Sequence, residues 1–284
     1  IRVSNEASGT TNITNSEIAY LGYSCSRCSG ISYYGGIGSI VKGNNIHHLL
    51  KGFYSKGMGS MIVENNTIHD NYLYGIDPHT GTHDMIIRNN KVYGNNASAI
   101  ICSKHCYNIL FEGNEVYKNG GDNRGIALSI NTTHSIARNN YVHDQLSCIG
   151  SNSASNFNTI EDNVFSNCKV AVNLADTSKN IINNNKIIGG QVAIVLRDTT
   201  NKILHNEIEN TTNGIVLLSS SNAKEVNSDN DKETKQVNSA AFLNRMNVVN
   251  EMTGVKNPVV VNDTHSAGEN DTQNSKFHAT TGQN

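Results

Sequence analysis

The sequence predicts an all-β protein, a parallel β-helix with three short strands in each coil of about 22–26 residues. First, one short motif recurs eight times: an aliphatic residue, two mostly polar residues, Asn, any residue, and then Ile, Val or Phe. Second, the apolar pieces are short, rich in β-branched residues and bounded by Gly and Asn, which is typical of strands. Third, the chain has two prolines and no long 3.6-residue period, which argues against helices.

The motif is illustrated by residues 41–46, 63–68 and 87–92. Its fixed asparagines are Asn44, Asn66, Asn90, Asn114, Asn140, Asn163, Asn185 and Asn206. This period is too short for helical repeats or propeller blades, whereas coils stacked ~4.8 Å apart accommodate it. We expect each Asn to take the left-handed turn geometry that Asn tolerates, and the stacked amides to form a hydrogen-bonded ladder.

A second column of strands aligns on a small residue at the start of each piece: Gly52, Gly75, Ala99 and Gly125. Side chains alternate along a strand, so this alignment assigns each one to a face. The predicted inward residues are Phe53, Ile76, Ile100, Cys102, Ile126 and Leu128. The predicted outward residues are Tyr54, Lys56, Asp77, His79, Ser103 and Ser129.

The repeat divides the chain into three parts. Residues 1–218 form the predicted β-helix, residues 219–261 an irregular insertion with a terminal coil or cap, and residues 262–284 a polar, flexible tail. The chain opens directly on a strand-like pattern at Ile1, so we expect that sequence upstream, such as a signal peptide, has been removed.

Composition excludes several classes of function. The formal net charge of -2 gives no general attraction to nucleic acid or anionic membranes, and no apolar run approaches the ~20 residues of a membrane span. Cysteine pairs at 25/28 and 102/106 have spacings that a zinc site could use. We favour a structural role for both pairs, as buried thiols or a local disulfide, because they lie in coils that close by themselves.

The segment from Tyr74 to Thr80 interrupts the repeat with a phenol, a carboxylate and an imidazole beside Pro78. The predicted register places Lys56 one rung below His79 and Ser103 one rung above. Lys104 follows Ser103, and Arg124 leads into the next rung, whereas Lys51 is expected to be an ordinary solvated cation. A shallow face with cations on successive rungs suits a polymer whose units each carry an acid.

The sequence Tyr74-Gly75-Ile76-Asp77-Pro78-His79 resembles the Tyr-Gly-(Phe/Ile)-Asp-Pro-His signature of the mannuronan C-5 epimerases. These are right-handed parallel β-helix enzymes that convert β-D-mannuronate to α-L-guluronate within alginate. The flanking rungs at 52–54 and 100–104 extend the resemblance over about residues 16–215. It implies that His79 and Tyr74 form the proton-transfer pair, that Asp77 orients or tunes them, and that Lys104 lies near the substrate carboxylate.

The implied chemistry is physically consistent. Inversion at C-5 removes a weakly acidic proton beside a carboxylate, so a cation must first neutralise that carboxylate. Lys104 can do this, with Lys56 or Arg124 in reserve. We take His79 as the base and Tyr74 as the acid, although the sequence leaves the reverse assignment open. The predicted substrate-binding residues are Tyr54, Lys56, Ser103, Arg124 and Ser129.

Two alternatives stay open. A polyuronate lyase would form the same enolate and then expel the 4-O-linked chain. A non-catalytic carbohydrate-binding β-helix is favoured by Thr80, which stands where the family commonly has an acidic residue. We expect an extracellular or cell-surface monomer that acts on an anionic polysaccharide and requires no cofactor. Calcium is a candidate because polyuronates bind it and some relatives use it, but no Asp/Glu cluster has the spacing of a dedicated site.

Overall fold

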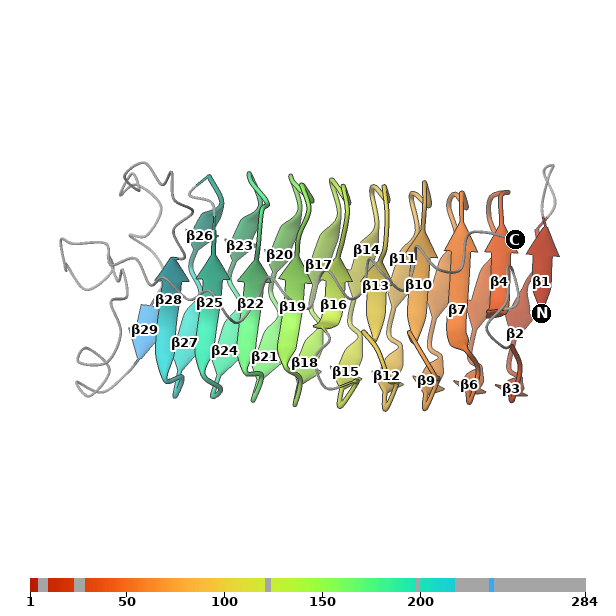
Figure 1. The fold of residues 1–284 in the computed structure, drawn as a ribbon, viewed down its shortest axis with the longest axis horizontal. Helices are drawn as coiled ribbons and strands as arrows, with labels where there is room; N and C mark the ends of the chain where they lie inside the picture. Colours follow the sequence, from red (N-terminus) through yellow and green to blue (C-terminus); the bar gives the residue numbers. More distant parts are fainter. Residues whose placement is uncertain (5–9, 23–28, 121–123, 198–199, 218–234, 238–284) are drawn as a thin grey trace, which may run out of the picture.

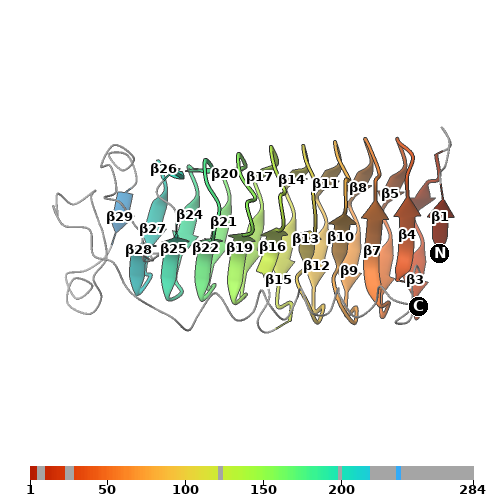
Figure 2. The ribbon, with the colours of Figure 1, turned by 45° about the horizontal axis from the view of Figure 1, so that its top comes forward.

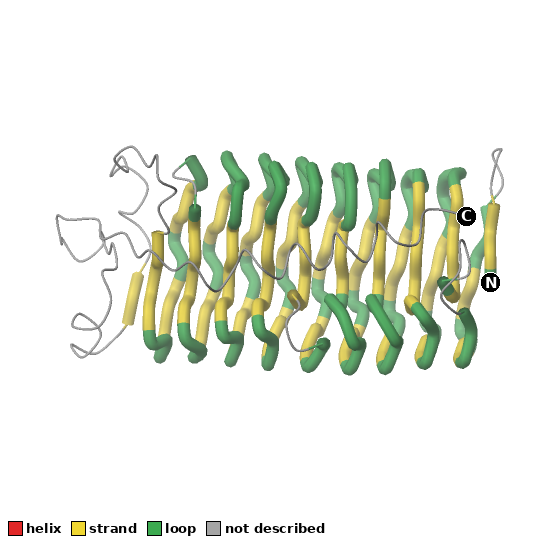
Figure 3. Tube along the Cα trace, in the orientation of Figure 1, coloured by secondary structure: helices red, strands yellow, loops and turns green. Residues whose placement is uncertain are grey.

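The computed structural model describes residues 1–4, 10–22, 29–120, 124–197, 200–217 and 235–237. Within these residues every regular element is a strand, and the strands form three parallel sheets along an elongated rod (Figures 1 and 3). Each coil contributes one strand to each sheet, as the view in Figure 2 shows for the central coils. The predicted β-helix with three short strands per coil is therefore confirmed.

The three sheets are named A, B and C. Sheet A contains β1 (Arg2–Ser4), β4 (Gly30–Tyr34), β7 (Lys51–Lys56), β10 (Ile76–His79), β13 (Ile100–Cys102), β16 (Arg124–Leu128), β19 (Ser147–Ser151), β22 (Val170–Leu174), β25 (Val192–Leu196) and β28 (Asn213–Leu217). Sheet B contains β2 (Ile13–Thr14), β5 (Ile40–Lys42), β8 (Ile62–Glu64), β11 (Ile86–Arg88), β14 (Leu110–Glu112), β17 (Ile136–Arg138), β20 (Thr159–Glu161), β23 (Ile181–Asn183) and β26 (Lys202–Leu204). Sheet C contains β3 (Glu17–Ala19), β6 (Asn45–His47), β9 (Thr67–His69), β12 (Lys91–Tyr93), β15 (Glu115–Tyr117), β18 (Tyr141–His143), β21 (Val164–Ser166), β24 (Lys186–Ile188), β27 (Glu207–Glu209) and β29 (Lys235–Val237).

The recurrent motif spans the corner between sheets B and C. Its first aliphatic residue, such as Val63, is the buried centre of a sheet B strand, and its last, such as Ile68, is the buried centre of a sheet C strand. These centres stack on their counterparts in the next coil, Ile87 and Val92. The motif therefore builds two of the three walls of one continuous apolar core.

The asparagine at that corner forms the predicted ladder. Asn66 accepts hydrogen bonds from the backbone N and the side-chain Nδ2 of Asn44 at 3.0 and 2.9 Å, and it donates its own Nδ2 to Asn90 Oδ1 at 2.9 Å. The same pairing continues through the motif to Asn206. A second ladder, which the sequence analysis missed, runs along the corner between sheets C and A through Asn71, Asn95, Asn119 and Gln145.

The expected left-handed geometry of the ladder asparagines is wrong. The residue before each ladder position has the positive φ instead, as at Asn65 (54°) and Asn89 (53°). The ladder residue must point its amide inward along the coil axis, so the preceding residue makes the turn. Asparagine is therefore selected at the ladder position for its hydrogen bonds and at the preceding position for its tolerance of left-handed geometry.

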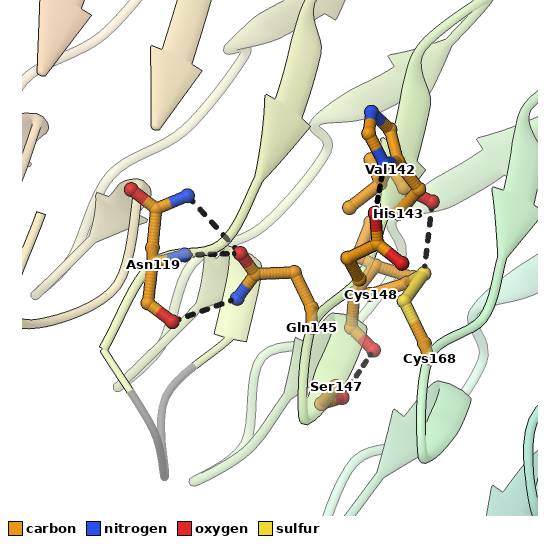
Figure 4. The surroundings of a disulfide bond; sticks show 9 residues. Asn119, Val142, His143, Gln145, Ser147, Cys148 and Cys168 are labelled. Carbon is orange, nitrogen blue, oxygen red and sulfur yellow. Dashed lines mark hydrogen bonds and ion pairs between the residues drawn. A yellow bond between two sulfur atoms is a disulfide. The ribbon is translucent and has the colours of Figure 1, made fainter. Parts of the chain in front are cut away.

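The cysteines have structural positions. Cys148 and Cys168 form a disulfide between successive coils with a Cα–Cα distance of 5.7 Å, close to the end of the second ladder at Gln145 (Figure 4). Cys102 and Cys106 are buried free thiols, which confirms the structural interpretation of that pair. The pair at 25/28 lies outside the described residues.

The predicted insertion at 219–261 and tail at 262–284 also lie outside the described residues, apart from β29, which pairs in parallel with β27. A search of the described residues found no helix long and apolar enough to cross a membrane.

Candidate functional site

The Tyr74–Thr80 segment contains β10 of sheet A, which is flanked by β7 and β13 (Figure 1). Asp77 pairs with Tyr54 and His79 pairs with Lys56, as predicted. The backbone N of Ser103 donates to Pro78 O at 3.0 Å, which places Ser103 directly above the end of β10. The predicted register around His79 is confirmed.

Asp77 is buried, which differs from the prediction that it shares an open outer face. Its side chain is 0% exposed; Ser103 Oγ donates to Oδ1 at 2.6 Å, and Lys51 Nζ donates to Oδ2 at 2.8 Å. Burial by itself would raise the pKa of Asp77, but the charges of Lys51 and His79 and the two hydrogen bonds outweigh it and hold the pKa below its usual value. Asp77 is therefore a carboxylate beneath the surface and positions its neighbours without direct access from solvent.

Lys51 is a residue of the candidate site that the sequence did not predict. It is 8% exposed, and it pairs with Asp77 instead of being solvated. Its Nζ lies 4.7 Å from the ring centroid of Tyr54 and 5.4 Å from that of Tyr74, in the range of cation–π contacts. Extending the strand alignment by one residue toward the N-terminus, to the position before Gly52 and Gly75, would have put Lys51 beside Tyr74.

Two phenols flank the buried ion pair. Tyr74 is 4% exposed and packs in a small apolar cluster with Ile101 and Ala127, outside the main core. Tyr54 is half-buried, and its ring centroid lies 5.6 Å from that of His79. Burial raises the pKa of both phenols, and the Asp77 carboxylate raises each further. Both phenols are protonated at neutral pH, so each can act as a proton donor.

Two threonines of the same coil contact His79. Its Nδ1 lies 2.5 Å from Thr80 Oγ1, so the threonine that follows His79 contacts the imidazole directly. The Thr82 hydroxyl donates to the backbone O of His79 at 2.8 Å, which closes the turn after β10. The imidazole is half-buried between Thr80 and the Tyr54 ring.

The remaining predicted residues spread over the neighbouring rungs. Lys56 and Lys104 are exposed, Lys56 on the rung below His79 and Lys104 just after Ser103 on the rung above. Arg124 is half-buried at the start of β16, where its backbone N donates to Ser98 Oγ at 3.3 Å, and its side chain lies over Gly150, where an added Cβ would meet Arg124 Cδ at 2.3 Å. Ser129 donates to Asn152 Oδ1 at 2.9 Å. Asp77, His79, Tyr74, Tyr54, Lys51 and Ser103 form the compact part of the site.

The chain belongs to the family described as the right handed beta helix region, which it matches over residues 1–155. Residues 149–233 also match the family described as periplasmic copper-binding protein (NosD). The described part of that second region has His205 and the disulfide-bonded Cys168, and His205 Nδ1 lies 3.0 Å from Asn183 Oδ1. No group of three or more His, Cys, Asp and Glu side chains among the described residues could hold a metal ion, so these residues do not fit a copper site.

Solved structures share the fold. A double mutant of the periplasmic alginate epimerase AlgG aligns with a TM-score of 0.63 and 20% identity over 75% of this chain and 57% of that one. The A-module of the Azotobacter vinelandii mannuronan C-5 epimerase AlgE4 aligns with a TM-score of 0.63 and 21% identity over 75% of this chain and 64% of that one. The Dettilon tailspike protein aligns with a TM-score of 0.59 and 18% identity over 72% of this chain and 47% of that one. The chain spans less than two thirds of each of these proteins, and no curated protein matches its sequence.

Proposed function

We propose that this β-helix modifies an anionic polysaccharide by proton transfer at C-5, converting β-D-mannuronate to α-L-guluronate in alginate-type polymers. The observation that carries the proposal is the buried Asp77–Lys51 pair beneath the phenols of Tyr54 and Tyr74 and next to His79. A buried ion pair is costly to maintain and contributes little net stability, so its place beside an imidazole and two phenols favours a functional role.

The roles follow from charge and exposure. His79 is the base that removes the C-5 proton, and a phenol is the acid that returns one to the opposite face. Tyr74 is our first assignment for the acid, as the signature implies. Tyr54 is the competing donor, since its ring is the less buried of the two and lies beside His79. Asp77 orients the site, while Lys51 balances its charge.

The substrate carboxylate requires a cation on the open face. We assign this role to Lys104, with Lys56 on the opposite side of His79, because both side chains are exposed while Lys51 is engaged with Asp77. Tyr54, Ser103, Arg124 and Ser129 are the other proposed substrate contacts. Ser103 and Ser129 already donate to Asp77 and Asn152, so they act mainly by shaping the surface.

This proposal places the site within residues 1–218 of an extracellular or cell-surface monomer. Likeness to alginate epimerases supports the substrate class, and the periplasmic AlgG and NosD proteins support the location. The residues of the site supply its acid–base chemistry, and no step is assigned to calcium.

The test is incubation of polymannuronate with the protein in deuterated water, followed by NMR. Deuterium at C-5 together with guluronate signals is the expected result. New unsaturated ends that absorb in the ultraviolet would identify the lyase alternative, in which the same enolate expels the 4-O-linked chain. Binding of uronans that is unchanged by His79→Ala, with no turnover by either protein, would identify a non-catalytic binding β-helix.

A further inference from the structure

A cavity of about 540 Å³ lies at the corner between sheets C and A, on the coils that carry the candidate site. Its volume falls in the usual ~300–1,000 Å³ range of small-molecule sites. The half-buried Leu50 contributes apolar surface above the buried Leu49, and Tyr20 and Tyr72, which are 77% and 68% exposed, also line the cavity. His48, Asp70 and Asn96 add polar groups at its edge.

The cavity lies close to the candidate site along the chain. Leu50 immediately precedes Lys51, and Tyr72 lies two residues before Tyr74 on the same coil. Tyr72 and His79 are seven residues apart, so they lie at most ~25 Å from each other. This upper limit is within the length of a short oligosaccharide.

The residue type at the turn of this corner differs from coil to coil. The residue that follows each sheet C strand from β3 to β27 has a positive φ. From the third coil toward the C-terminus, this position is mostly taken by residue types that tolerate a positive φ. These residues are Asp70, Gly94, Lys118, Asp144, Asn167, Gly189 and Asn210. In the first two coils, this position is taken by Tyr20 (φ 58°) and His48 (φ 55°), whose ring centroids lie 5.0 Å apart. Three of these turn residues, Tyr20, His48 and Asp70, line the cavity, and the rings of Tyr20 and His48 lie against each other there.

We propose that this cavity is a carbohydrate subsite that binds a pyranose unit of the polysaccharide away from the reacting unit. The face of a pyranose ring carries C–H groups and its rim carries hydroxyls, so the flat, exposed ring of Tyr72 suits its face. Asn96 and His48 supply hydrogen-bonding groups for the rim. Asp70, whose Oδ2 lies 2.7 Å from His69 Nδ1, offers carboxylate oxygens that accept hydrogen bonds, so the hydroxyl edge of the sugar faces it. This inference deepens the proposed function and rests on it for the identity of the polymer.

The test is calorimetric binding of a mannuronate tetrasaccharide and a neutral 1,4-linked hexopyranose tetrasaccharide to the protein carrying His79→Ala, which prevents turnover. Adding Tyr72→Ala should weaken binding about tenfold, and Tyr72→Phe should retain it, because the phenyl ring preserves the stacking surface. Tyr141→Ala is the matched control, because Tyr141 is 44% exposed on β18 and distant from the cavity. Tyr20→Asn should also weaken binding without lowering the melting temperature, since Asn accepts the left-handed geometry.

Binding of either oligosaccharide that depends on Tyr72 supports the subsite, and binding of the uronate alone shows that its carboxylate contributes. Equal affinities in the Tyr72→Ala and Tyr141→Ala proteins, or binding of neither sugar, would overturn it. A Tyr20→Asn protein that melts lower but binds normally would show that the turn has only a structural role. Tyr72-dependent binding without C-5 exchange by the wild-type protein would refute the proposed reaction and leave the subsite standing.

Discussion

Replacing Lys51 with methionine should destabilise the protein strongly. The substitution keeps most of the side-chain volume but removes the ammonium that lies 2.8 Å from Asp77 Oδ2. Asp77 is fully buried, so its carboxylate would keep the hydrogen bond from Ser103 but lose its charged partner. Breaking a buried pair in this way costs about 3–5 kcal/mol, compared with about 0–1 kcal/mol for an exposed pair.

The measurement is urea unfolding followed by circular dichroism, with Lys51→Met compared with the double variant Lys51→Met/Asp77→Asn. The double variant removes both charges, and the Asn side chain can still accept from Ser103, so it should recover most of the lost free energy of unfolding. Lys42→Met is the matched control, because Lys42 bonds Glu64 at 2.9 Å with a side chain that is 51% exposed. A Lys51→Met cost no greater than that of Lys42→Met would refute the role assigned to this pair.

The same pair predicts a pH dependence. The folded-state pKa of Asp77 is lowered, so its contribution to stability is present above the unfolded pKa of about 3.9 and is lost as the pH falls through the folded value. In the Lys51→Met protein, Asp77 is buried without a charged partner, so its pKa should rise. Protonation of Asp77 should then remove the free-energy cost of burying an unpaired carboxylate. The difference in unfolding free energy between the wild-type and Lys51→Met proteins should therefore shrink as the pH falls toward 4. A constant difference across that range would show that charge is not the cause.

Three further predictions concern the ladder, the disulfide and the acid. Asn114→Ala should cost about 2–4 kcal/mol in urea unfolding, because it strands the buried donors that Asn114 Oδ1 satisfies; a cost below 1 kcal/mol would contradict the ladder's role. Opening the Cys148–Cys168 disulfide by replacing both residues with serine should cost about 3 kcal/mol, since the bridge closes a loop of 20 residues; unchanged unfolding would contradict this. Tyr74→Phe should lower epimerisation about 10²–10⁴-fold with little change in melting temperature if Tyr74 is the acid; a loss confined to Tyr54→Phe would assign that role to Tyr54.

The fold and the local register could be predicted from the sequence, because each coil repeats the same short pattern and the strand starts align on small residues. Phe53, Ile76 and Ile100 stack inward in the order expected from alternation. The position of His79 between Lys56 and Ser103 follows from the same alignment.

The burial of Asp77 could not be predicted, because it depends on how side chains from the two neighbouring coils pack over it. Alternation places Asp77 outward, yet Lys51 and Ser103 bind it, and it is fully buried. The corner residue Tyr74 packs over Ile101 outside the main core, a contact that no strand period encodes. The sequence also could not show which residue of the corner has the positive φ. Both Asn65 and Asn66 suit a turn, and only the inward direction of the Asn66 amide in the structure separates their roles.

Transfer of deuterium from solvent to C-5 of polymannuronate, compared between the wild-type protein and His79→Gln, tests the proposed reaction most directly. We predict that the wild-type protein introduces deuterium and guluronate together, and that His79→Gln does so at least about 100-fold more slowly while melting at a similar temperature. Equal incorporation by the two proteins, or none by the wild-type protein, would contradict the role assigned to His79.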